Sequence, residues 1–515
     1  MAKYGTFKYS EEMYGYTDPG RRLSWGLVID WADTGTFISG YNEAYSYGEN
    51  EHKMFALNTK AGRQYFINSN GNNFQNVDAS RMQVQLYDMG GRYDPYNMDG
   101  PLYQHVLPGK KFRLIVRDEV NQVNYPIMVG RIDDIRPNFG IVSTVTITGV
   151  NGIDDLQNIT VKTDQVYTSK TFDEAITKTL QQANWKDGMR IDSDISAQLP
   201  YWWLSGDTAF DELSDLTNSS RGLFFVSYDG YATYYSNINS MESVASYVDT
   251  DALLSYGIRI PTPWEAIKNY VRVYAKARRA STGTLWTLQS KPYIGAGSSI
   301  TIWAEGASVN GDTVPALSVT TPVATTDYTA NSSEDGSGTN ITANISITMT
   351  NYATTQKLVI SNTGGVNGYL TLMQLRGTSI TSDEYTYYET NDTDSITTYK
   401  QRELVVKTNW IQSINDAEDY ANTITSLLAE PKKFPRFVVR AKPQKQFAPD
   451  IFDIVSVDFQ SKQLTGDFRV GYIEHNWVIT NGDIVDTTFY LEPNTAGNIS
   501  GTWVFPALFD LSTKF

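Results

Sequence analysis

Alternating apolar and polar positions along most of the chain predict β-structure. In the segment 144–150, for example, Val145 and Ile147 alternate with threonines. Successive side chains of a strand point to opposite faces, so a period of two residues predicts a strand with one buried face. Short segments of this kind, separated by turns, run through residues 25–155 and are expected to form one all-β unit, a barrel-like domain.

A helical pattern follows in residues 156–240. Thr171 and Glu174 have the spacing of a capping box and precede apolar residues that recur along one helical face. Asp207 is expected to cap a second helix, and the Asp-Gly pair at 229–230 is expected to turn a hairpin. These residues are therefore expected to form a small α/β domain.

Residues 281–395 have a different composition, dominated by Thr, Ser, Asn and Gly with few charges. In the segment "ANISITM" every second residue is apolar, and the strand spacing is typical of an immunoglobulin-like β-sandwich. The flanking residues 241–280 and 396–493 contain further strands and one helix, which Asn415 is expected to cap. They are expected to form a second β-barrel-like domain that the sandwich interrupts.

The expected fold is therefore mainly β with a smaller α/β part. It consists of two β-barrel-like domains, an α/β domain and an inserted immunoglobulin-like β-sandwich. Residues 1–24 are expected to form an N-terminal arm, and residues 494–515 a C-terminal tail.

Composition and charge exclude several classes of function. The chain has 42 Lys and Arg against 57 Asp and Glu, a net charge of −15, and no basic stripe, so sequence-specific nucleic acid binding is not expected. Cysteine is absent, which excludes disulfides, thiolate metal sites and cysteine nucleophiles. No signal-peptide pattern and no run of about 18 apolar residues occurs, so membrane insertion is not expected either.

Few side chains in the sequence are of the types that catalyse reactions or bind metal ions, and they are scattered along the chain. The three histidines, His52, His105 and His475, stand in no pattern that a catalytic triad or a metal site requires. Neighbouring carboxylates such as Asp133 and Asp134 point to opposite faces of a strand, so they cannot work as an acid/base pair. We therefore expect no catalytic residue, no metal site and no cofactor, although carboxylates distant in sequence could still converge in space.

An aromatic cluster, Tyr201, Trp202 and Trp203, allows two interpretations. Its flat faces suit sugar rings, so it could form a sugar-stacking platform. It also precedes an expected helix, where such a cluster more often covers a hydrophobic core. Both interpretations stay open at the level of sequence, with the core favoured.

The stretch "GGRYDPYNMDGPLYQHVLPGKKFRLIV", residues 90–116, combines turn residues with an abrupt strand. Pro95 presets its own backbone angle and pushes Asp94 towards extended geometry, and the Pro-Gly pair at 108–109 predicts a second turn. Apolar residues then occupy every second position from Phe112 onward. The segment is expected to be a structured loop that enters a strand.

Followed by "YPIMVGRIDDIRPNFGIVSTVTITGVNGIDDL", this stretch resembles the amino-terminal segment of bacteriophage tail hub proteins, the minor tail proteins on the tail axis beneath the tube. The family pattern is a "DGRYDPYN…SPL…LPG" loop, then a basic strand, then a "GRID" strand. Later segments, including the closing strands, also resemble that family, so the likeness covers most of the chain. The pattern is carried here by Gly91, Arg92, Tyr93, Asp94, Pro95, Tyr96, Asn97, Pro101, Leu102, Pro108, Gly109, Arg113, Gly130, Arg131, Ile132 and Asp133.

The resemblance implies a structural virion protein rather than an enzyme: a homotrimeric hub, made in the host cytoplasm and located at the distal tip of the phage tail. Three copies with two barrels each would join a sixfold tail tube to a threefold host-recognition apparatus around the DNA exit channel. The implied partners are distal tail or tail tube proteins above, a tip fibre or receptor-binding protein below, and the tape measure protein. The role of the inserted sandwich does not transfer.

The resemblance also singles out an architectural motif, which lies either at a ring interface or inside one barrel. Two other functions stay open: a tail-associated cell-wall hydrolase, and a carbohydrate-binding adhesin that acts through the inserted sandwich. The motif consists of Arg92, Tyr93, Asp94, Pro95, Tyr96, Asn97, Pro108, Gly109, Gly130 and Arg131.

Overall fold

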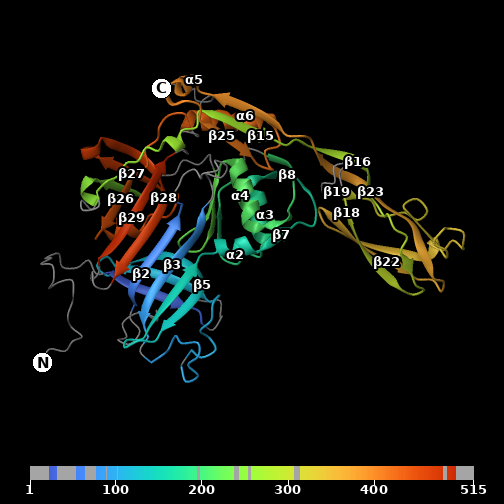
Figure 1. Cartoon of the computed structure of the whole chain (residues 1–515), viewed down its shortest axis with the longest axis horizontal. Coiled ribbons are helices and arrows are strands. Elements are labelled where there is room, and N and C mark those ends of the chain that lie inside the picture. The colour runs from blue at the N-terminus through green and yellow to red at the C-terminus, as the bar shows by residue number, and fades with distance from the viewer. Residues whose placement is uncertain are drawn as a thin grey trace.

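The structure is a computed structural model of the 515-residue chain (Figure 1). Its fold is mainly β with a smaller α/β part, as the sequence predicted. Almost all of the expected N-terminal arm and C-terminal tail, and also His52, lie outside the described residues. The described residues are 23–31, 54–63, 77–88, 90–100, 102–193, 198–236, 243–252, 257–306, 314–478 and 484–494.

One 11-stranded sheet forms the largest part of the molecule. Its strands run in the order β1-β4-β5-β6-β3-β2-β28-β27-β14, and β29 pairs with both β28 and β26. The strands are β1 (Leu23–Ile29), β2 (Met54–Gly62), β3 (Asp78–Tyr87), β4 (Lys111–Asp118), β5 (Val123–Asn138), β6 (Thr144–Val150), β14 (Ala245–Val248), β26 (Arg436–Arg440), β27 (Ile454–Phe459), β28 (Leu464–Val478) and β29 (Val485–Pro493).

The expectation of two separate barrels is wrong in one respect, because strands from both expected barrels lie in this single sheet. The cause is β28, a strand of 15 residues. One edge of β28 pairs with β29, while the other edge pairs first with β27 and then, over 472–478, with β2. Among the described strands the sheet does not close on itself into a barrel.

Each half of the sheet nevertheless has a hydrophobic core of its own. We call β1–β6 the N-terminal lobe, whose core includes Trp25 and Phe112, and β14 with β26–β29 the C-terminal lobe, whose core includes Phe437. A buried ion pair joins the lobes: the Arg63 guanidinium, just after β2, donates to both carboxylate oxygens of Glu492 on β29, at 2.8 and 2.7 Å. The two lobes are therefore parts of one body.

The α/β unit lies in the middle of the molecule (Figure 1). Its apolar side chains form one core, with Phe172 and Leu213 buried from two helices. Its elements are α2 (Ile153–Asn158), β7 (Thr160–Lys162), β8 (Tyr167–Thr171), α3 (Phe172–Gln182), β9 (Met189–Ile191), β10 (Gln198–Trp202), β11 (Ser205–Thr208), α4 (Ala209–Ser220), β12 (Leu223–Val226) and β13 (Ala232–Tyr235).

The expected helix starts are confirmed in one case and shifted in two. Helix α3 has the capping box, with the backbone N–H of Thr171 donating to the Glu174 carboxylate at 3.3 Å. Helix α4 is capped by Thr208 rather than Asp207. The C-terminal helix α6 is capped by Ser413 rather than Asn415. Each shift moves the cap to a neighbouring side chain that is equally able to accept a backbone N–H.

A second small sheet stands apart from the main one. It has the order β24-β15-β25 and packs against α6, with Val271 and Val273 buried. Strands that the sequence assigned to the second barrel and to the insert therefore pair with one another. The elements are β15 (Tyr270–Ala275), β24 (Thr386–Asn391), α5 (Thr393–Tyr399), β25 (Glu403–Lys407), α6 (Ile414–Leu428) and, further on, α7 (Pro443–Phe447).

Residues 278–382, here called the distal unit, extend away from the rest along the longest axis (Figure 1). Two sheets enclose one core, as expected for a sandwich: β18-β22-β21 on one side, and β23 with its partners β16, β17, β19 and β20 on the other. The immunoglobulin-like arrangement stays a prediction. The strands are β16 (Arg278–Thr287), β17 (Tyr293–Ile294), β18 (Ser299–Glu305), β19 (Ala316–Val319), β20 (Tyr328–Asn331), β21 (Ile345–Asn351), β22 (Thr355–Asn362) and β23 (Gly368–Ser382).

Short 3-10 helices complete the described elements. None of the helices in the described part of the chain combines the length and the apolar character needed to cross a bilayer. The 3-10 helices are η2 (Asp249–Asp251), η3 (Trp264–Ala266), η4 (Thr342–Asn344) and η5 (Gln460–Lys462).

Candidate functional site

The loop between β3 and β4, which contains most of the architectural motif, is a series of tight turns. The backbone N–H groups of Asp94, Asn97 and Gly100 each donate to the carbonyl three residues earlier, at 3.3, 3.2 and 3.0 Å. The Asn97 side chain donates back to the carbonyls of Gly90 and Gly91 at 3.2 and 2.9 Å. The loop thus has a defined shape, as its turn residues predicted.

One aromatic side chain of this loop is buried in the core, and two apolar side chains are exposed on the surface. Tyr93 is fully buried in the core of the N-terminal lobe, where its ring centroid lies 6.2 Å from that of Trp31. Tyr96 and Met98 point outward and are 84% and 71% exposed. Of the other motif residues, Arg92, Asp94, Pro95 and Asn97 are half-buried, and Pro108 is exposed.

The remaining motif residues meet at the base of the loop. At Gly130 a Cβ atom would lie 2.0 Å from the carbonyl oxygen of Val150, so only glycine allows β5 to pass this close to the end of β6. The Arg131 guanidinium donates to Asp155 on α2 at 2.7 Å and to the carbonyl of Gly109 at 3.3 Å. The base of the loop therefore ties the N-terminal lobe to the α/β unit.

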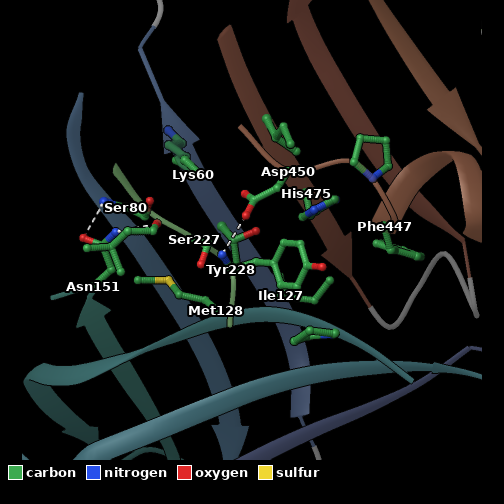
Figure 2. Close-up of a pocket in the computed structure, with 16 residues that line it drawn as sticks. Lys60, Ser80, Ile127, Met128, Asn151, Ser227, Tyr228, Phe447, Asp450 and His475 are labelled. Atoms are coloured by element: carbon green, nitrogen blue, oxygen red, sulfur yellow. Dashed lines mark hydrogen bonds between the residues drawn. The ribbon is translucent and has the colours of Figure 1, made fainter. Parts of the chain in front are cut away.

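A second joint, which we call the central joint, connects the α/β unit to both lobes (Figure 2). The hairpin expected at 229–230 is present and presents the backbone N–H of Tyr228, which donates to Asp450 at 2.9 Å. Asn151 accepts the backbone N–H of Ser80 on β3 at 3.1 Å and donates to the carbonyl of Val226 on β12 at 3.5 Å. Sequence reasoning missed this joint, since its partners lie far apart in the chain.

The carboxylates of this joint are buried and perturbed. Burial, followed by the charge of Asp453, raises the pKa of Asp450 to about 8. Burial raises the pKa of Asp453 to about 6, against the opposing effect of its hydrogen bond from the backbone N–H of Asp450 at 2.8 Å. Both side chains accept backbone N–H groups, so their geometry is that of structural connectors.

The histidines take no part in a catalytic arrangement among the described residues. His475 is buried, its Nδ1 lies 2.9 Å from Thr487 Oγ1, and burial lowers its pKa to about 3. It therefore stays neutral over the ordinary pH range. His105 is exposed in the loop that follows Tyr96.

The aromatic cluster at 201–203 belongs to a third joint, where the distal unit leaves the body. Trp202 is buried in the core of the α/β unit, so the core interpretation is confirmed for it. The Arg278 guanidinium carbon, at the start of β16, lies 4.3 Å from the ring centroid of Trp203 and 4.1 Å from that of Trp410. Arg278 also donates to the carbonyl of Tyr201 at 3.2 Å. We call this arrangement the Arg278 clamp.

Two carboxylates of α4 face the Arg278 clamp. Burial, with a contribution from Asp207 and Asp215, raises the pKa of Glu212 to about 8. Burial also raises the pKa of Asp215, although its hydrogen bonds from Asn409 oppose this shift. Raised carboxylate pKa values are a signal for general acids as well as for buried connectors, but both groups here are enclosed at a junction between elements.

The central joint has little room for a small-molecule substrate. The cavity at the central joint has a volume of about 30 Å³, whereas ligand pockets usually reach about 300 Å³ or more. In the described part of the chain, no cluster of three or more His, Asp or Glu side chains could hold a metal ion. The arrangement joins parts of the molecule, and nothing in it resembles a substrate site.

Comparison with known proteins gives a structural likeness and no match in sequence. No protein-family model matches the chain, and no curated protein matches it. The tail protein from Neisseria meningitidis MC58 is 9% identical, with a TM-score of 0.50 over 93% of this chain and 99% of that chain. The 43 kDa tail protein of prophage MuSo2 from Shewanella oneidensis is 9% identical, with a TM-score of 0.49 over 92% and 99%. The prophage tail protein gp18 from Listeria monocytogenes is 6% identical, with a TM-score of 0.39 over 94% and 98%.

Because the two sequences are only 9% identical, the likeness to the Neisseria protein shows a similar fold and does not by itself show a shared function. It covers nearly the full length of both chains, so it includes both lobes of the main sheet. This result agrees with the resemblance seen in the sequence, which rested on different observations. The chain therefore has the fold of a tail protein.

Proposed function

We propose that the chain is a structural phage tail protein, the trimeric hub of the tail tip, and that it acts by shape rather than by catalysis. The observation that carries this proposal is the fold shared with the Neisseria tail protein along almost the whole chain. The hub-like sequence pattern in residues 90–133 supports the same assignment.

The two lobes give the proposal its physical logic. Each copy offers two β-rich lobes, held in one sheet by β28 and by the Arg63–Glu492 ion pair. Three copies in a closed ring would present six lobes to a sixfold tube, while the ring itself keeps threefold symmetry. Closed barrels are not required for this match. What matters is that both lobes belong to one sheet.

The proposed neighbours follow from a position on the tail axis. Distal tail or tail tube proteins would lie above the ring, and a tip fibre or receptor-binding protein below it. The tape measure protein and then the DNA would pass through the central channel. A net charge of −15 favours weak contact with DNA phosphates, so the channel would not hold its cargo. The chain would be made in the host cytoplasm and end in the virion.

Within the ring, we assign the tip of the motif loop to a contact between copies. Tyr96 and Met98 are the most exposed apolar side chains of this loop, and aromatic residues and methionine are enriched in the cores of interfaces. The hydrogen bonds of Asn97 hold this tip in shape before a partner binds. The base of the motif, at Gly130 and Arg131, fits the alternative, because its contacts lie within one copy.

The mass of the purified chain in solution tests this proposal. Light scattering coupled to gel filtration is expected to give a trimer for the wild type at high concentration. The double variant Tyr96→Ser with Met98→Ser is expected to give a monomer with an unchanged circular dichroism spectrum. Tyr293→Ser, which changes a 50% exposed side chain of the distal unit, is the matched control and should remain trimeric. A wild-type monomer at every concentration contradicts the trimer, and a trimeric double variant contradicts the role of the loop.

One observation, the exposed ring pair of Trp303 and Tyr352, favours a second function, which is carbohydrate binding by the distal unit. The hydrolase alternative needs two carboxylates that face each other across an open cleft. The described carboxylates with strongly raised pKa values, Glu212 and Asp450, are buried at joints instead. No observation here favours wall hydrolysis over a structural role.

A further inference from the structure

The outer face of the β18-β22-β21 sheet carries an exposed aromatic pair. Trp303 on β18 is 55% exposed, and Tyr352, in the turn between β21 and β22, is 36% exposed. Their ring centroids lie 6.1 Å apart and their planes differ by 28°, so the two rings are stacked on each other, and this stacked pair is here called the platform. Neighbouring residues Ala304 and Leu358 point inward and are fully buried, which fixes the direction of the Trp303 side chain.

Trp303 is the most exposed tryptophan among the described residues. The next most exposed, Trp264 at 46%, has the Arg402 guanidinium over its ring at 4.4 Å and the ring of Tyr399 at 6.3 Å. Trp303 has the ammonium group of Lys357 over its ring at 5.8 Å and the ring of Tyr352 at 6.1 Å, and it is still 55% exposed. An indole exposed to water costs free energy, because its apolar surface gains from burial.

The surroundings of the platform are polar and rich in hydroxyl groups. Strand register places Lys357 and Thr350 in one row with Trp303. The adjoining rows are formed by Thr301, Val359 and Thr348, and then by Ser299, Ser361 and Ser346. Glu305 and Thr355 lie on the other side of Trp303. The face therefore combines one aromatic platform with many donors and acceptors.

This combination matches a pyranose ring more closely than it matches a protein surface. A pyranose has an apolar face of C–H groups, which stacks on an indole, and a rim of hydroxyl groups, which bond to hydroxyl, ammonium and carboxylate side chains. A stable protein interface instead needs an apolar centre within roughly 800 Å² of contact on each partner. Here the apolar side chains of these rows are the aromatic pair and Val359, and most of their neighbours are hydroxyl side chains.

We propose that this face is a binding site for a pyranose glycan, with the exposed surface of the stacked Trp303 and Tyr352 rings contacting a sugar ring and Lys357, Glu305 and Thr350 bonding its hydroxyl groups. The site is a flat open surface, so it suits a sugar unit within an extended polymer. The inference does not depend on ring assembly. Glycan binding by a chain that stays monomeric would support this inference and contradict the hub proposal. A trimeric chain that binds no glycan would support the hub proposal and contradict this inference.

The test uses the full chain and immobilised oligosaccharides of β-linked glucose, galactose and N-acetylglucosamine, followed by titration calorimetry with the oligosaccharide that binds best. Trp303→Ala is expected to weaken binding by about tenfold, which is about 1.4 kcal/mol, because it removes both the aromatic contact and the apolar area that the contact buries. Trp303→Phe should retain part of the affinity. Tyr293→Ala, an equally exposed aromatic on the opposite sheet, is the matched control and should bind as the wild type does.

Three results would overturn the inference. The wild type could bind none of these oligosaccharides, Trp303→Ala could bind as tightly as the wild type, or Tyr293→Ala could lose affinity to the same extent. Thermal unfolding of each variant shows whether the distal unit is intact. A loss of affinity by Trp303→Ala with an unchanged melting temperature supports the site.

Discussion

At the scale of single residues, buried and half-buried polar side chains connect segments that are far apart in sequence. Arg278 lies between two indoles from different elements, and Asp450 accepts a backbone N–H from a hairpin 222 residues earlier. Such groups stabilise a fold only while they are fully partnered, because an unpartnered buried group retains its desolvation cost. Their removal should therefore cost more than the loss of exposed charges.

The Arg278 clamp gives the first prediction at this scale. Arg278→Ala removes the cation between Trp203 and Trp410 and leaves the carbonyls of Tyr201 and Asn409 without this donor. We expect the free energy of unfolding to fall by about 2–4 kcal/mol. Arg279→Ala is the matched control: its exposed ion pair with Asp383 should contribute less than about 1 kcal/mol. Urea denaturation measures both, and equal effects would contradict the clamp.

The second prediction at this scale concerns the pH dependence of the free energy of unfolding. The pKa of Glu212 is about 8 in the folded chain, above its ordinary 4.5, so between these values the folded state keeps a proton that the unfolded chain has lost. Stability must then fall as pH rises through this window. His475 acts in the opposite direction, but only below its ordinary pKa of 6.5. Asp450, whose pKa is also about 8, acts in the same direction as Glu212, so the contribution of Glu212 over pH 6.5–8 is the difference between the wild type and a Glu212 variant.

Glu212→Gln keeps the side-chain shape and removes this proton. We expect the urea midpoint to decline less steeply between pH 6.5 and 8 in the variant than in the wild type. Glu334→Gln, at an exposed position of the distal unit, should leave the slope unchanged. If Glu212→Gln follows the wild-type curve, the carboxyl group does not stay protonated in the folded chain.

At the scale of elements, local patterns predicted the strands and helices well but not their pairing. The alternation of Val145 and Ile147 and the capping box at Thr171 were correct, because neighbouring residues determine both. The pairing of β2 with β28 was missed, since Thr59 and His475 are joined only by the register of distant strands. Nor does any local signal place Trp410 beside Arg278. The motif loop was predictable because its turn residues specify its shape.

A glycine in β5 gives the prediction at this scale. Gly130→Ala would place a methyl group 2.0 Å from the carbonyl oxygen of Val150, a backbone atom that cannot move without breaking the β5–β6 pairing. We expect a loss of about 2–4 kcal/mol of stability. Gly140→Ala is the control, since the nearest atom to its added methyl lies at an ordinary 3.6 Å, and its stability should change by less than about 0.5 kcal/mol. Thermal unfolding of both variants measures these effects. A Gly130→Ala variant as stable as the wild type would contradict the close approach of β5 to the end of β6.

At the scale of the whole molecule, one sheet unites two lobes, while the distal unit extends away from them (Figure 1). The sequence predicted the two β-rich parts but treated them as separate barrels. Their union strengthens the proposed role, because a body that spans two positions of a sixfold tube has to keep those positions at a fixed spacing. The distal unit is attached through the Arg278 clamp, so it can have the separate glycan-binding activity proposed for it.

The most direct test of the central claim is an electron microscopy map of the intact particle that contains this chain. The proposal predicts three copies around the tail axis, with both lobes of each copy against the tube, Tyr96 at a contact between copies and the distal unit facing outward. A tail axis without this chain, or a copy number other than three at the tip, would contradict it.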